Sequence, residues 1–226
     1  MPDNHSLQAV IWDFDGTLVD TEPIWARTEQ QIMARHGVHW TDEMMRAKIG
    51  QPATLSAKQM AEAVGDPDSA DEFYAELHDR VAGHILEHDL PFLPGVRSLI
   101  HELEREQVRA AVVTASNGQI LDAARSRLPE VFEFIITADD VERSKPHPDP
   151  YLLAFERMDI DPLDAIILED SVPGSRSGLD AGGVVYAVPE LVHIRQETRM
   201  HISHDALKTT TLADLRHVWR KLRAAV

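Results

Sequence analysis

Four short clusters of polar residues follow apolar stretches of the chain, and their groups suit phosphoryl transfer. The clusters are Asp13-Phe14-Asp15-Gly16-Thr17, Thr114-Ala115-Ser116-Asn117, Lys145-Pro146 and Glu169-Asp170-Ser171. A carboxylate can attack a phosphate as a nucleophile when a divalent cation screens its charge. A second carboxyl can protonate the leaving oxygen and then accept a proton from the attacking water. The residue types therefore indicate phosphoryl transfer through an aspartyl phosphate.

The spacing of these residues agrees with that chemistry. Asp13 and Asp15 are two residues apart, so in an extended backbone both side chains point to the same side. Thr114 and Lys145 would hold the phosphoryl oxygens while charge redistributes in the reaction. The carboxylate oxygens of Asp13 and Asp170 are hard ligands, which favour magnesium over zinc.

The elements that must position these clusters are short apolar runs, typical of strands that are covered on both faces. The runs lie at residues 7–12, 108–113, 134–136, 165–168 and 184–188. Helical patterns over 96–103, 119–127 and 151–158 separate the later runs. This alternation predicts a doubly wound α/β fold with a parallel sheet, in which ligands bind beyond the carboxyl ends of the strands.

One long interval breaks the alternation, because it contains no convincing strand. Its patterns predict helices over 22–36, 41–48, 52–64 and about 73–85. We therefore predict an α/β core formed by residues 1–20 and 93–226, with a small helical cap inserted at residues 21–92. The expected hinges are residues 18–21 and 91–95. Beyond residue 190 the chain combines a polar, His-rich segment with a terminal helix, and the sequence assigns this tail no function.

Composition excludes several classes of partner. The chain has 226 residues, with 22 Lys and Arg against 38 Asp and Glu, so its formal charge is −16. This acidity argues against nucleic acid, which requires clustered basic side chains. Cysteine is absent, which excludes disulfides and thiolate catalysis. No apolar stretch reaches the roughly 18 residues of a membrane span, and the first five residues lack signal-peptide features. We expect a cytoplasmic protein with no membrane partner; its oligomeric state is left open.

The four clusters, in this order, resemble the four motifs of haloacid-dehalogenase-like (HAD) phosphatases, over residues 7 to about 188, and the helical insert matches the helical cap of that family. The resemblance implies Asp13 as the nucleophile and Asp15 as the general acid and base. It also implies Mg²⁺ held by Asp13, the backbone carbonyl of Asp15 and Asp170, with Glu169 close by or acting through water. The phosphate- or substrate-binding residues implied are Thr114, Ala115, Ser116 and Lys145.

The first motif also bears on the substrate. Dehalogenases of this family lack the second aspartate and phosphonate-cleaving members replace it with Ala, so Asp15 indicates phosphate esters. Residues 15–25 are similar to bacterial sugar-phosphate and sugar-alcohol-phosphate phosphatases related to 2-deoxyglucose-6-phosphatase. We therefore predict an Mg²⁺-dependent phosphatase acting on a small phosphorylated metabolite, a sugar or polyol phosphate. Glu22 and Asn117 are candidate substrate contacts, although Glu22 also suits the first turn of a helix. Further polar cap candidates are Arg27, Gln51 and Lys58.

Two other functions stay open. The β-phosphoglucomutase group shares the second and fourth motifs, but its cap carries an arginine shortly after a glycine, and residues 50–54 of this chain contain none. The other is a non-catalytic binding protein that has kept the fold, against which the complete set of acids and lysine argues.

Two alternative metal sites have less support. A calcium loop at Asp13 would need a further ligand before a glycine at its sixth position, and a helix upstream. The pairs His84 with His88 and His201 with His204 lack a third ligand for zinc.

Overall fold

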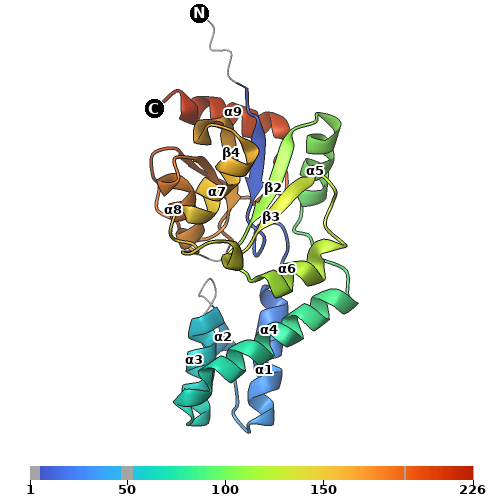
Figure 1. Cartoon of the computed structure of the whole chain (residues 1–226), viewed down its shortest axis with the longest axis vertical. Helices are drawn as coiled ribbons and strands as arrows, with labels where there is room; N and C mark the ends of the chain where they lie inside the picture. Colours follow the sequence, from blue (N-terminus) through green and yellow to red (C-terminus); the bar gives the residue numbers. More distant parts are fainter. Residues whose placement is uncertain (1–5, 47–52, 191, 226) are drawn as a thin grey trace, which may run out of the picture. The chain divides into compact units, whose positions relative to one another are not determined.

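A computed structural model describes residues 6–46, 53–190 and 192–225, and these residues form two compact units (Figure 1). The first unit contains the described residues among 1–20, 91–118 and 128–226. The second contains those among 21–90 together with 119–127. The helical unit thus includes a short segment from later in the chain, in addition to the inserted helices.

The first unit is built on a six-stranded parallel sheet with the strand order β3-β2-β1-β4-β5-β6. The strands are β1 Ala9–Trp12, β2 Arg109–Val113, β3 Phe132–Ile136, β4 Ala165–Glu169, β5 Val184–Ala187 and β6 Met200–Ile202. Every residue of β1, β4 and β5 is buried, which explains why their sequences are continuous apolar runs. The structure confirms the predicted α/β fold with a parallel sheet.

Helices cover both faces of this sheet, as a doubly wound fold requires (Figure 1). On one face, α7 Asp149–Met158 packs against β2 and β3, and α8 Val172–Asp180 packs against β4 and β5. On the other, α9 Leu212–Arg223 packs against β4, β5 and β6, beside α5 Val96–Arg105. Short 3-10 helices, η2 Ala138–Asp140 and η3 Pro162–Asp164, lie before α7 and β4. In the described part of the chain no helix is both long and apolar enough to span a membrane.

The tail contributes more to the sheet than the sequence predicted. The terminal helix is confirmed as α9, but β6 was not predicted at all. Only Met200 of its three residues is buried, and the strand pairs with β5 alone, so it lacks the apolar run of the central strands. Arg199 fixes its start by donating hydrogen bonds to the carbonyl oxygens of Leu179, in the last turn of α8, and of Gly183, directly before β5.

The second unit consists of helices and the turns that connect them in its described part. Its helices are α1 Glu22–Arg35, α2 Asp42–Arg46, α3 Ala53–Val64, η1 Pro67–Ser69, α4 Ala70–Glu87 and most of α6 Gly118–Arg125. Ile32, Met60 and Leu77 pack in its apolar core. Buried Glu29 accepts a hydrogen bond from Trp40 Nε1 at 2.9 Å, which satisfies both groups inside that core.

The two segments predicted as hinges pair with each other. Val19 and Phe92 form an antiparallel bridge. Asp20 N donates to Pro91 O at 2.8 Å, and Leu93 N donates to the carbonyl oxygen of residue 18 at 3.1 Å. The chain therefore leaves and re-enters the first unit through a short paired ribbon directly after the first motif.

Candidate active site

The register of the sheet brings three residues to one level at the carboxyl ends of its central strands. Trp12 of β1 lies between Val112 of β2 and Leu168 of β4. The next residue of each strand is therefore at the same level, namely Asp13, Val113 and Glu169. The first and fourth motifs thus meet at the sheet edge where ligands bind in this class of fold.

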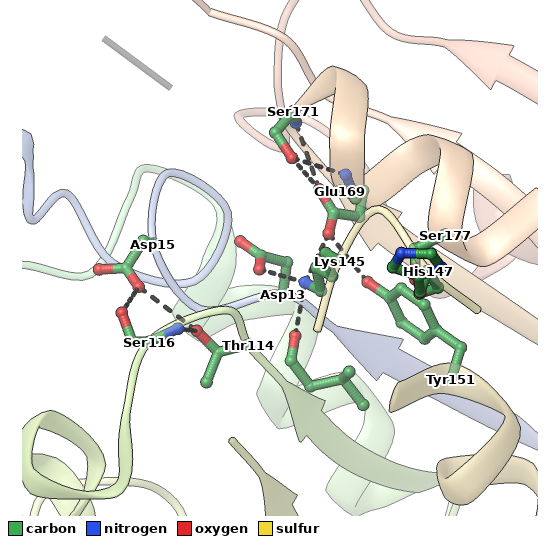
Figure 2. Close-up of polar contacts among 12 residues, drawn as sticks. Asp13, Asp15, Thr114, Ser116, Lys145, His147, Tyr151, Glu169, Ser171 and Ser177 are labelled. Atoms are coloured by element: carbon green, nitrogen blue, oxygen red, sulfur yellow. Dashed lines mark hydrogen bonds and ion pairs between the residues drawn. The ribbon is translucent and has the colours of Figure 1, made fainter. Parts of the chain in front are cut away.

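Lys145 reaches this row from the loop before α7 and contacts all three of its members (Figure 2). Its Nζ donates to Asp13 Oδ1 at 2.6 Å, to Val113 O at 2.8 Å and to Glu169 Oε1 at 2.6 Å. These bonds use all the protons of the ammonium group, and the side chain is only 3% exposed. Burial lowers the pKa of Lys145, but the two carboxylates raise that pKa by more, so the lysine stays charged.

Glu169 is fully buried, and both of its carboxylate oxygens accept hydrogen bonds. Oε1 accepts from Lys145 and also from the Tyr151 hydroxyl at 2.9 Å. Oε2 accepts from the Ser171 hydroxyl at 2.9 Å and from the Ser171 backbone N–H at 3.2 Å. Ser171 in turn caps α8, because its Oγ accepts a hydrogen bond from Gly174 N at 3.0 Å. The chain therefore fixes the Glu169 carboxylate from both sides.

Gly174 lets α8 approach this carboxylate closely, and replacing it with Ala should displace Glu169. A Cβ at position 174 would lie 1.8 Å from Glu169 Oε1. The Gly174→Ala variant is expected to lose about 1–3 kcal/mol of unfolding free energy through overpacking, together with most of its catalytic activity. The matched control is Gly83→Ala on α4, where an added Cβ meets nothing within 4 Å. Thermal melting compares the two variants; equal melting temperatures would contradict this packing.

Asp13, Glu169 and Asp170 form an acidic cluster, with one carboxylate oxygen from each lying within 4.8 Å of the others. Asp13 Oδ2 is buried and has no hydrogen-bond partner among the described residues. Gly16 leaves room for Asp170, because a Cβ at position 16 would lie 2.3 Å from Asp170 Oδ2. When all three carboxyl groups are ionised, they carry two more negative charges than the single ammonium of Lys145 can balance. A divalent cation with a preference for oxygen ligands, such as Mg²⁺, fits this donor set.

The protonation of these acids reflects their burial. In the chain alone, burial raises the pKa of Asp13 from 3.8 to about 8; Lys145 opposes this shift, and Glu169 and Asp15 add to it. Burial also raises the pKa of Asp170, with Asp13 and Glu169 contributing to the rise. A cation at this cluster would favour the ionised carboxylates and would therefore compete with protons.

Asp15 belongs to a second hydrogen-bonded group, formed with the residues that follow β2 (Figure 2). Its Oδ2 accepts from the Ser116 hydroxyl at 2.6 Å and lies 3.4 Å from the Thr114 hydroxyl oxygen. Thr114 Oγ1 also accepts from Ser116 N at 3.0 Å. Ala115, between them, is exposed. Thr114 and Ser116, predicted as phosphate contacts, thus hold the Asp15 carboxylate in the chain alone.

The candidate substrate contacts lie in different units. Glu22 is in the first turn of α1, where its charge suits the helix dipole. Asn117 is half-buried in the loop between β2 and α6. Arg27 lines a groove of about 370 Å³ between α1 and α4. Lys58 is exposed on α3, and Gln51 lies outside the described residues.

The sequence interpretation gave no role to Tyr151 or Gly174. Tyr151 follows Lys145 by six residues, and its sequence context showed only a helical pattern. The sequence around Gly174 does contain a pattern that could have indicated its role. Ser171, with Pro173 and Gly174 in the turn that follows, is typical of a capped helix start at which the backbone approaches another group.

A family model described as haloacid dehalogenase-like hydrolase matches residues 10–188. The chain belongs to this family. The HAD hydrolase is 30% identical over 210 residues to the bifunctional riboflavin kinase/FMN phosphatase of Arabidopsis thaliana, covering 92% of this chain. It spans only about half of that relative, 54% of its length. It is 32% identical over 185 residues to hexitol phosphatase A of Escherichia coli K12, covering 79% of this chain and 81% of that protein.

A solved structure supports the same assignment. The crystal structure of CbbY from Rhodobacter sphaeroides in complex with phosphate superposes with a TM-score of 0.76 at 26% identity. The match covers 92% of this chain and 99% of that one. The predicted membership in the HAD family is therefore confirmed, and the matched residues include all four motifs.

Proposed function

We propose that this HAD hydrolase is a phosphatase that acts on a small phosphorylated metabolite, a sugar or sugar-alcohol phosphate. The main support for the proposal is that two carboxylates at one sheet edge, those of Asp13 and Asp15, have different hydrogen-bond partners. Asp13 is held by Lys145 at 2.6 Å, whereas Asp15 is held by Ser116 at 2.6 Å. Two carboxyl groups in different surroundings suit two different tasks, nucleophilic attack and proton transfer. The similarity to hexitol phosphatase A supports the substrate class.

The reaction takes place in two displacements at phosphorus. In the first, a carboxylate oxygen of Asp13 attacks phosphorus, the bond from phosphorus to the leaving oxygen breaks, and Asp15 gives that oxygen its proton. In the second, water attacks phosphorus and gives a proton to Asp15, and the bond from phosphorus to Asp13 breaks. Inorganic phosphate leaves, and both carboxyl groups return to their starting states. Lys145 holds the Asp13 carboxylate in place, while Thr114 and Ser116 orient Asp15.

The acidic cluster would supply the metal site. Asp13, Asp170 and the backbone carbonyl of Asp15 would hold Mg²⁺, because Asp13 Oδ2 is buried without a partner among the described residues. When bound, the ion screens the charge of the acids from that of the phosphate.

Mg²⁺ is expected to raise the melting temperature, and to raise it more at about pH 8 than at about pH 6. The folded-state pKa of Asp13 is about 8, above its ordinary value of 3.8. The metal-free chain therefore loses stability as the pH rises from about 3.8 to about 8, and the cation restores that loss by pairing with the ionised acids. Calorimetry with Mg²⁺ or EDTA measures the shift. Asp170→Asn should remove most of it, and equal shifts at both pH values would contradict the assignment.

A panel of phosphorylated metabolites, scored for both released phosphate and isomerised products, tests the function. A phosphatase releases phosphate from sugar or sugar-alcohol phosphates in the presence of Mg²⁺. Isomerised sugar phosphate without free phosphate would establish a phosphomutase instead. No turnover of any compound would favour a binding protein.

A further inference from the structure

Tyr151 is a buried polar residue without a part in the chemistry proposed for the acids. It lies on α7 with no exposed surface, inside the core cluster that covers one face of the sheet. Its hydroxyl donates to Glu169 Oε1 at 2.9 Å, the same oxygen that accepts from Lys145. Lys145 Nζ lies 5.1 Å from the centre of the Tyr151 ring. Tyr151 therefore contacts both members of the buried ion pair (Figure 2).

The hydroxyl of Tyr151 completes the set of bonds that immobilises Glu169. The carboxylate accepts four hydrogen bonds, two on each oxygen, which is about its full capacity. It cannot rotate without losing at least one of them. Lys145 is then fixed by Glu169 and by the Val113 carbonyl oxygen, so its remaining N–H is directed at Asp13.

Packing alone does not explain a tyrosine at this position. Phenylalanine would fill the same apolar space, and burying a hydroxyl is unfavourable unless it is hydrogen-bonded. The phenol is also kept neutral, because burial and the nearby acids raise the pKa of Tyr151 well above 10. It therefore remains a hydrogen-bond donor.

We propose that Tyr151 is a positioning residue, which holds Glu169 against Lys145 and so aims the lysine at Asp13. The inference rests on the proposed phosphatase function. In it, Glu169 positions Lys145 through a hydrogen bond and is not a ligand of the metal. Its effect should accordingly be seen in kcat, with the affinity for Mg²⁺ unchanged.

The test compares Tyr151→Phe with Tyr186→Phe. Tyr186 is a second buried tyrosine, on β5, whose hydroxyl lies 3.2 Å from Thr210 Oγ1. Loss of the Tyr151 hydroxyl should lower kcat about tenfold, since one hydrogen bond to a charged group is removed. KM for the best substrate of the panel and the Mg²⁺ dissociation constant from calorimetry should stay unchanged. Tyr186→Phe should lose a similar amount of thermal stability and keep its kcat.

A second variant, Ser171→Ala, tests the same inference in case Tyr151→Phe fails to fold. Ser171→Ala removes the hydroxyl that binds the other oxygen of Glu169. It should also lower kcat at unchanged Mg²⁺ affinity. Normal kcat in Tyr151→Phe would overturn the inference, as would an equal kcat loss in Tyr186→Phe.

Weakened Mg²⁺ binding, with kcat restored at high Mg²⁺, would also overturn the inference, because Glu169 would then act as a metal ligand. Different results would refute the proposed function and the positioning role of Tyr151. A wild-type chain that releases no phosphate refutes both, whereas full activity in Tyr151→Phe refutes only the positioning role.

Discussion

Replacing Asp13 with Asn is expected to lower kcat on a generic aryl phosphate by about 10⁵-fold, the scale seen when a covalent nucleophile is removed. The amide has the shape of the carboxyl group but is a far weaker nucleophile. Its oxygen can still accept the hydrogen bond from Lys145 that Asp13 Oδ1 accepts at 2.6 Å. The fold should therefore survive, and steady-state phosphate release with Mg²⁺ measures the loss.

Asp164→Asn is the matched control for that experiment. Asp164 is also a buried aspartate, but it precedes β4 and accepts a hydrogen bond from Gln8 Nε2 at 2.9 Å. It lies at the opposite end of the sheet from Asp13, so its variant should keep full activity even if it melts earlier. Turnover retained in Asp13→Asn would refute the mechanism.

Replacing Lys145 with Met is expected to damage both stability and activity. The variant leaves Asp13 and Glu169 buried together without their cation, which costs about 3–5 kcal/mol of unfolding free energy for a broken buried pair. The nucleophile also loses its positioning charge, so kcat should fall by about 10²–10³-fold. Urea unfolding and steady-state kinetics measure the two effects.

Two further lysine variants make this prediction specific. Lys145→Arg keeps the charge but should restore little activity, because a planar guanidinium cannot reproduce three bonds from one nitrogen. Lys58→Met removes an exposed lysine on α3 and should change the unfolding free energy by less than about 0.5 kcal/mol. Wild-type stability in Lys145→Met would contradict the role of this ion pair.

The central part of the fold could be predicted from sequence because its strands are buried on both faces. Continuous apolar runs predicted β1, β2, β4 and β5, and those of β1, β2 and β4 end next to polar residues. The edge strand β6 could not be predicted in this way. It is short, pairs with one neighbouring strand and buries one residue, so its sequence contains no continuous apolar run. Burial, the property that sequence patterns report, is low at such an edge.

The sequence could predict which side chains converge at the candidate site, but it could not predict the hydrogen bonds between them. The motifs identified Asp13, Asp15 and Lys145, since strand ends converge at one edge of a parallel sheet. They did not show that Ser116 would contact Asp15, which depends on how the loop after β2 folds. The bond from Tyr151 to Glu169 depends on how α7 packs on the sheet. Contacts between distant segments depend on tertiary packing, which local patterns do not encode.

The stereochemistry at phosphorus tests whether the reaction passes through a phosphorylated aspartate. A substrate made chiral at phosphorus with oxygen isotopes and sulfur would be hydrolysed in isotopically labelled water, and the configuration of the released thiophosphate determined. Two successive in-line displacements, by Asp13 and then by water, each invert the configuration, so we expect overall retention. Net inversion would show that water attacks the substrate directly, and would contradict a phosphorylated aspartate.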